Sequence, residues 1–178
     1  MLWIAALWGG AEATLWFLVA DIPISVIAVR FGWRSAALAA LFAALGAAVG
    51  GAWTYVWASF DPMGATRAML ALPAIDAPLI ILTAVDFATH GYRGMLHGAL
   101  TGTPYKLYVL AAAAQHEPIL RLVAMTPLVR LPRFLAVCLL SAGIGHLLSG
   151  WLSMRARLII LGIVWVIFYA IYFTIMSG

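Results

Sequence analysis

Apolar stretches separated by short polar breaks make up almost the whole chain. Trp33–Phe60, Phe134–Leu148 and Leu158–Met176 are the stretches that we expect to cross a membrane. A helix needs about 20 mainly apolar residues to cross the roughly 30 Å of hydrocarbon in a bilayer. The pattern therefore predicts an all-α integral membrane protein, with about four transmembrane helices and no soluble domain.

Two other apolar segments are each broken near the middle. The first, Trp3–Val29, contains Glu12, and each of its two pieces is shorter than a membrane span. Short apolar pieces of this kind are typical of re-entrant or interfacial segments. We therefore expect a re-entrant helical hairpin with its turn near Ala20–Pro23. The second segment, Met95–Ala114, is divided in the same way by Thr101–Lys106.

The order of these elements repeats along the chain. Each broken segment is followed by a basic pair, Arg30/Arg34 or Arg130/Arg133, and then by a helix rich in small residues. Interrupted segments at corresponding positions in two halves point to the binding site of a transporter. The predicted single membrane domain, residues 1–178, accordingly divides into a first hairpin and span (1–60), interfacial and linking helices (66–93), a second hairpin and span (94–150) and a final span (155–178).

Glycine and proline add two local expectations. Gly46 and Gly50 form a small-xxx-small repeat, which lets another helix approach closely. Pro118 opens a further helix, and Pro127 and Pro132 are expected to interrupt it before the span at Phe134–Leu148. Together these features predict one tightly packed helix pair and one broken helix.

Composition agrees with a membrane protein and narrows its partners. The chain is 66% hydrophobic and 9% charged, whereas soluble domains are about 25% charged. The net charge of +4 suits an anionic membrane surface, and we expect a multi-pass protein of the cell's inner (plasma) membrane. The ten basic residues are scattered in ones and twos, which argues against nucleic-acid binding. A homo-oligomer stays open.

Glu12 and Asp21 are the acidic candidates for function. An ionisable group inside the membrane costs about 2.5–3.5 kcal/mol on insertion scales, so it usually faces a cavity, a partner or a substrate. The two carboxylates flank the expected turn of the first hairpin and could approach one another. A desolvated carboxylate, or one beside another, binds a proton more readily, which indicates proton coupling. The alternatives are that Asp21 caps the following helix and that Glu12 pairs with an arginine to support the fold.

Lys106, Arg130 and Arg133 are the cationic candidates. The start of a broken helix carries a partial positive charge and free N–H groups. A lysine and guanidinium groups near it would make an anion site suited to phosphate. Thr103 and Tyr105 lie in the same break and belong to the candidate substrate site. The alternative is that Arg130 and Arg133 hold lipid headgroups at the interface, or pair with Glu12 and support the fold.

The sequence predicts no catalytic residues, cofactor or metal. It contains no H-E-x-x-H, G-x-S-x-G or phosphate-loop motif. Its four histidines have no carboxylate or cysteine at ligand spacing. We therefore expect a binding or transport protein and not an enzyme.

Several short motifs resemble one membrane family. The motifs are Gly10–Leu15, Asp21–Pro23, Thr103–Lys106 with the alanine run Ala111–Ala114, and Arg130–Phe134. They are similar to motifs of the DedA family, also called the SNARE-associated or VTT-domain superfamily, and more closely of its YqaA-like branch. The resemblance covers most of the chain.

This resemblance implies two oppositely oriented re-entrant hairpins that meet near the membrane midplane, surrounded by spanning helices. It also implies movement of a phosphorylated lipid, either a polyprenyl phosphate or a phospholipid, driven in some members by protons. Glu12 and Asp21 then belong to the acidic hairpin, and Lys106, Arg130 and Arg133 to the basic one. Two other hypotheses stay open: a structural or assembly factor with a buried salt-bridge network, and a proton-coupled small-ion antiporter.

Overall fold

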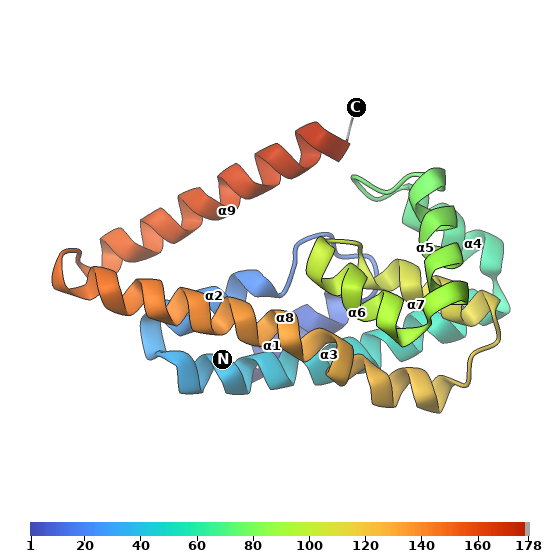
Figure 1. Cartoon of the computed structure of the whole chain (residues 1–178), viewed down its shortest axis with the longest axis horizontal. Coiled ribbons are helices and arrows are strands. Elements are labelled where there is room, and N and C mark those ends of the chain that lie inside the picture. The colour runs from blue at the N-terminus through green and yellow to red at the C-terminus, as the bar shows by residue number, and fades with distance from the viewer. Residues whose placement is uncertain (177–178) are drawn as a thin grey trace.

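The computed structural model describes residues 1–176, and most of them lie in helices. These residues contain no strand, and the helices follow one another through short connections (Figure 1). They are α1 (Leu2–Glu12), α2 (Asp21–Phe31), α3 (Trp33–Phe60), α4 (Pro62–Leu70), α5 (Ala77–His90), α6 (Tyr92–Thr101), α7 (Tyr105–Ala114), α8 (Ile119–Leu147), a 3-10 turn (Leu148–Gly150) and α9 (Met154–Met176). The predicted all-α class is confirmed.

Three of the described helices are long and apolar enough to cross a membrane. They are α3, α8 together with its terminal turn, and α9. The sequence predicts all three, as Trp33–Phe60, Phe134–Leu148 and Leu158–Met176. The apolar helices α5 and α7 are shorter than a span, so the fourth crossing expected from the sequence has no counterpart of full length in residues 1–176.

One expectation about α8 is wrong. Pro127 and Pro132 do not interrupt the helix, which runs unbroken through both. A proline inside a helix removes one hydrogen bond. A complete break would leave several more backbone groups unpaired, at a cost of several kcal/mol each where no water can reach them. Continuity has a consequence for function, because it places Arg130 and Arg133 about one turn apart on a single helix.

The predicted close helix pair is confirmed between α1 and α3. Gly46 lies against the backbone of Ala6, and Gly50 against the backbone of Gly10, so closely that a Cβ at either glycine would overlap a carbonyl oxygen. Further along, the Thr54 hydroxyl donates to the carbonyl of Ala13 at 2.9 Å. Residue numbers rise together on both helices, so α1 runs parallel to the second half of α3. Because α1 is held against α3 in this way, the end of α1 has a defined position along α3. Glu12 is the last residue of α1.

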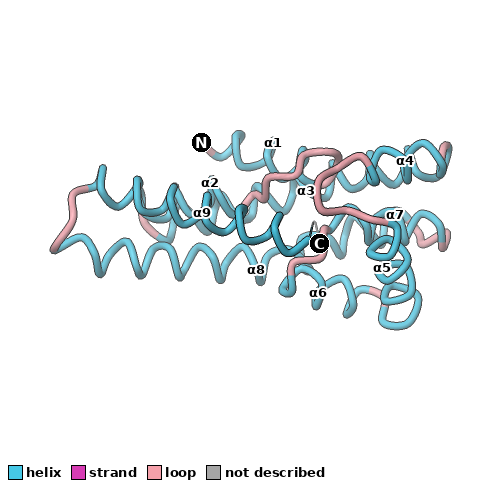
Figure 2. The backbone as a smooth tube through the Cα atoms, turned by 90° about the horizontal axis from the view of Figure 1, so that it is seen from above, coloured by secondary structure: helices cyan, strands magenta, loops and turns pink. Residues whose placement is uncertain are grey.

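The first break lies earlier than the sequence predicts. Residues 13–20 are non-helical, and α2 already begins at Asp21, whereas the expected turn was Ala20–Pro23. The reason is that Pro23 falls in the first turn of α2, where its missing N–H is not needed. The second break is a short connection, Gly102–Pro104, within the predicted Thr101–Lys106. Gly102 adopts φ of 101°, a left-handed conformation that favours glycine. Figure 2 shows both breaks in pink between the helices.

The last helix, α9, stands apart from the others. After the turn that ends α8 it leads away from α8 at an open angle (Figure 1). Its packing is mainly against α2 and the turn that precedes it. The result is a wedge between α8 and α9 on the side of the molecule where the two breaks lie.

Candidate functional site

Both helix breaks face one cavity of about 460 Å³, which is partly open to the surface. Residues of both breaks, of α8 and of α9 line it, together with part of the loop between α4 and α5. Four of its lining side chains carry charge: Glu12, Lys106, Arg130 and Arg133. Segments about 90 residues apart in sequence thus meet at one charged cavity in an otherwise apolar protein.

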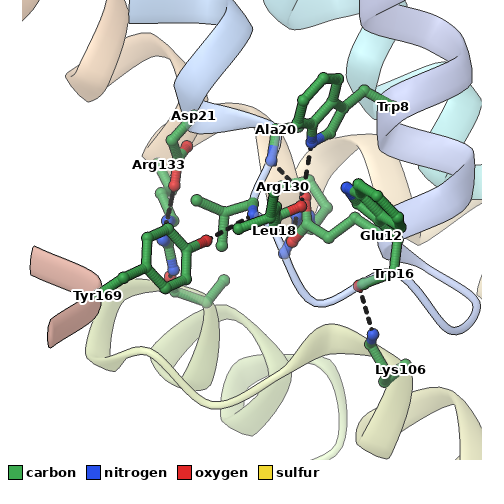
Figure 3. Close-up of polar contacts among 12 residues, drawn as sticks. Trp8, Glu12, Trp16, Leu18, Ala20, Asp21, Lys106, Arg130, Arg133 and Tyr169 are labelled. Atoms are coloured by element: carbon green, nitrogen blue, oxygen red, sulfur yellow. Dashed lines mark hydrogen bonds and ion pairs between the residues drawn. The ribbon is translucent and has the colours of Figure 1, made fainter. Parts of the chain in front are cut away.

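Glu12 and Arg130 form a buried ion pair across this cavity. The Arg130 Nη2 donates to Glu12 Oε1, and Glu12 Oε2 accepts a hydrogen bond from the backbone N–H of Ala20 at 2.8 Å. The Arg130 guanidinium also lies over the rings of Phe134, at 4.6 Å, and Tyr105, at 5.4 Å. Glu12 therefore connects the end of α1 to both the start of α2 and the middle of α8 (Figure 3).

Asp21 and Arg133 form a second pair one helical turn away on α8. The Nε and Nη2 of Arg133 both donate to Asp21 Oδ2, at 2.8 and 2.6 Å. The third donor, Nη1, binds the carbonyl of Ala99 on α6 at 2.9 Å. Asp21 is 1% exposed, and its Oδ1 has no hydrogen-bond partner among the described residues. This pair joins α2, α6 and α8.

The two acids come close enough for their charges to interact, as the sequence analysis allowed. Glu12 and Asp21 bind different arginines and form no hydrogen bond with each other in residues 1–176. Asp21 does not cap α2 either, because its side chain makes no cap hydrogen bond. Glu12 follows the alternative stated for it, a pairing with an arginine.

Lys106 differs from the other charged residues of the site. It is the second residue of α7 and is 4% exposed, and its Nζ donates to the backbone carbonyl of Trp16 at 2.7 Å (Figure 3). None of the ion pairs among the described residues includes it. Three cations and two carboxylates make up the cluster, so one positive charge is uncompensated, and Lys106 carries it.

Thr103 and Tyr105 have separate places at the site. Both line the cavity, but the Tyr105 hydroxyl is already hydrogen-bonded to the Oγ1 of Thr126 on α8, at 2.6 Å. The ring of Tyr105 lies against Gly51 of α3 on one side and the guanidinium of Arg130 on the other. Tyr105 therefore helps to position Arg130, whereas the side chain of Thr103 interacts with Tyr108.

An aromatic surface of α9 completes the cavity, and the sequence analysis does not include it in the site. Phe168, Tyr169, Tyr172 and Phe173 line the cavity, and the Tyr169 hydroxyl accepts a hydrogen bond from the backbone N–H of Val19 at 2.8 Å. A signal exists in the sequence: the four aromatics recur at the three- and four-residue spacing of one helix face. On a membrane helix the same spacing is also typical of a lipid-facing surface, so the pattern cannot decide between the two.

Taken together, the site is suited to an anion. The first N–H groups of α7 have no partner within the helix and carry the positive end of its dipole. Lys106 adds a full charge at the same place. Arg130 and Arg133 add forked donors of the kind that bind phosphate in pairs. The rest of the cavity is mainly aromatic and aliphatic.

The comparisons with known proteins do not extend this description. No family model, no curated protein and no solved structure matches the chain.

Proposed function

We propose that this protein is a lipid transporter of the DedA type, which moves a phosphate-bearing lipid across the membrane. The observation that carries the proposal is the uncompensated Lys106 in a cavity formed between two broken helical segments. Lys106 has a carbonyl partner but, within residues 1–176, no carboxylate at ion-pair distance. A buried charge left without a counter-charge is costly, and an anionic ligand at this point would supply one. The two broken segments act in this proposal as the re-entrant hairpins of that family.

Phosphate fits the site better than a carboxylate or a halide. It has enough oxygens to accept from a lysine, a guanidinium and backbone N–H groups at the same time. Thr103, whose side chain interacts with Tyr108, lies on the same cavity wall. The apolar part of the same cavity, which includes Trp16 and Phe17, would lie against the part of the lipid next to its headgroup.

The ion pairs give the transporter a way to couple substrate and proton. A phosphate that binds Arg130 competes with Glu12 for the same guanidinium. The released carboxylate is then free to take up a proton, so substrate binding and proton uptake would be linked. In this proposal a proton gradient drives the lipid in one direction.

Transport by the purified protein in liposomes tests the proposal. A fluorescent phospholipid in the inner leaflet reports its transfer to the outer leaflet, and Lys106→Met is the variant to compare. Methionine keeps most of the buried side-chain volume but removes the charge, so we expect a folded protein without transport. Arg155→Ala is the control, because it also removes one cation but at an exposed position outside the cavity.

A second function has a specific observation in its favour. The pairs Glu12–Arg130 and Asp21–Arg133 join α1, α2 and α8, as a structural or assembly factor with a salt-bridge network would require. Under that alternative wild-type liposomes move no lipid. Proton-linked ion flux without lipid movement would instead favour the small-ion antiporter.

A further inference from the structure

The wall of the cavity formed by α8 changes character along the helix. Arg133, Ala136, Val137 and Leu140 all line the cavity, at the three- and four-residue spacing of a single helix face. The stripe begins at a guanidinium bound to Asp21 and continues with apolar side chains only. The cavity therefore has a charged end and an apolar end.

The apolar end is open to the outside. Leu140 on α8 is 65% exposed and Phe168 on α9 is 43% exposed, although both line the cavity. They stand on the two sides of the wedge between α8 and α9. Both helices are long and apolar enough to cross a membrane, and in a bilayer that they span this mouth would face hydrocarbon.

The wall formed by α9 contacts the rest of the protein through few side chains, among them Arg157, which donates to the carbonyl of Gly145 on α8 at 2.8 Å, and Phe173, whose ring lies against that of Phe17. Two hydrogen bonds tie its cavity-facing side to the core: Tyr169 accepts from the N–H of Val19 at 2.8 Å, and the Trp165 Nε1 donates to Ser25 Oγ at 3.0 Å. Because few side chains of α9 are buried, its separation from the core would disrupt little packing.

From these observations we infer that the wedge between α8 and α9 is a lateral entrance, and that it holds the hydrocarbon chain of the ligand while the anionic headgroup lies at Lys106. The inference rests on the proposed function for the headgroup. Its physical basis is that a charged headgroup needs the polar end of the cavity, whereas a chain loses nothing by remaining in contact with the bilayer. An amphiphile that enters sideways satisfies both requirements.

Photolabelling tests the inference directly. Wild-type protein is reconstituted in vesicles with a phosphatidic acid that carries a diazirine in one acyl chain, and labelled residues are identified by mass spectrometry. We expect enrichment at Leu140 and Phe168 over Leu139, which is 58% exposed but does not line the cavity. Equal labelling of Leu139 and Leu140 would show ordinary lipid contact and overturn the inference.

A matched pair of substitutions gives an independent check. Ala136→Trp places a large ring in the entrance, and we expect loss of the enriched label on Phe168 and loss of transport of the long-chain lipid. Leu139→Trp adds the same ring to the same helix outside the cavity and should change neither. If both variants keep the Phe168 label, the chain does not occupy the wedge.

Headgroup binding is tested separately with dodecyl phosphate as competitor. If the wedge is labelled but neither dodecyl phosphate nor Lys106→Met changes the label, the entrance is supported and the phosphate site is wrong. If phosphate competition depends on Lys106 but no label appears in the wedge, the entrance is wrong and the proposed function stands.

Discussion

Removal of one partner of the Glu12–Arg130 pair should cost far more than removal of both. Glu12 is 8% exposed and Arg130 is 3% exposed, so a single substitution leaves a buried charge without its partner. Such losses cost about 3–5 kcal/mol, whereas replacement of both partners by neutral groups of similar volume is often close to neutral. We therefore expect Glu12→Gln and Arg130→Met to destabilise the protein strongly and the double variant to recover most of the loss.

The two single variants should differ because of Lys106. Its charge interacts with both Glu12 and Arg130. After Arg130→Met, the carboxylate of Glu12 keeps a nearby cation, so the loss should be near the lower value, about 3 kcal/mol. After Glu12→Gln, Arg130 and Lys106 are two neighbouring buried cations, and the loss of stability should be about 5 kcal/mol.

Equilibrium unfolding of the four proteins in mixed micelles measures these free energies as a double-mutant cycle. With single losses of about 3 and about 5 kcal/mol and a double variant close to neutral, a coupling energy of about 6 kcal/mol or more is expected. Additive losses, with a coupling energy near zero, would refute the reasoning that the pair is buried and mutually compensating. Transport by the double variant then separates two roles of the ion pair: a stable but inactive protein shows that transport needs the pair, and a stable protein that still moves lipid shows that the pair is structural only.

Three further predictions concern packing, the first break and pH. Gly46→Ala adds a Cβ that overlaps the α1 backbone and should destabilise the protein by about 1–3 kcal/mol. Gly143→Ala, in α8 with open space around it, should stabilise it by up to about 1 kcal/mol. Thermal unfolding in detergent compares the two variants, and equal effects would contradict the close packing. Thr54→Val removes the buried hydroxyl that donates to the first break and should cost about 1–3 kcal/mol in the same measurement, with an unchanged midpoint counting against it. A hydrogen bond from Tyr108 holds the pKa of Asp86 below its ordinary value of 3.8. The stabilisation from this hydrogen bond is therefore complete above that value and disappears as pH falls through the lower pKa of the folded state. Melting curves from about pH 6 to about pH 3 should show this loss of stability, and the loss should be smaller in Asp86→Asn.

Local sequence features predict much of the fold. Trp33–Phe60 and Leu158–Met176 are recognisable as spans because hydrocarbon requires long uncharged helices. Gly46 and Gly50 predict a close helix partner because only small residues let two backbones meet. The second break is also correctly placed, since Gly102 and Pro104 end one helix and begin the next.

The break after α1 and the continuity of α8 are less accessible to sequence reasoning. Asp21 followed by Pro23 is a signal for a helix start, yet the expected turn was placed there and not before it. Pro127 is a helix breaker in water, but a helix surrounded by hydrocarbon keeps its hydrogen bonds because the alternative leaves more groups unpaired. In both cases the surroundings of the segment determine whether the helix breaks or continues, and the local sequence does not contain information about those surroundings.

The sequence by itself determined which residues bear charge in an apolar chain, and therefore where a site is to be sought. Glu12, Asp21, Lys106, Arg130 and Arg133 stand out because each would be costly in hydrocarbon. Only the tertiary structure decided which acid binds which arginine, which cation remains without a carboxylate, and which helix closes the cavity. The physical reason is that an ion pair depends on distances of a few ångströms between segments as much as 118 residues apart, and packing of the whole chain sets those distances.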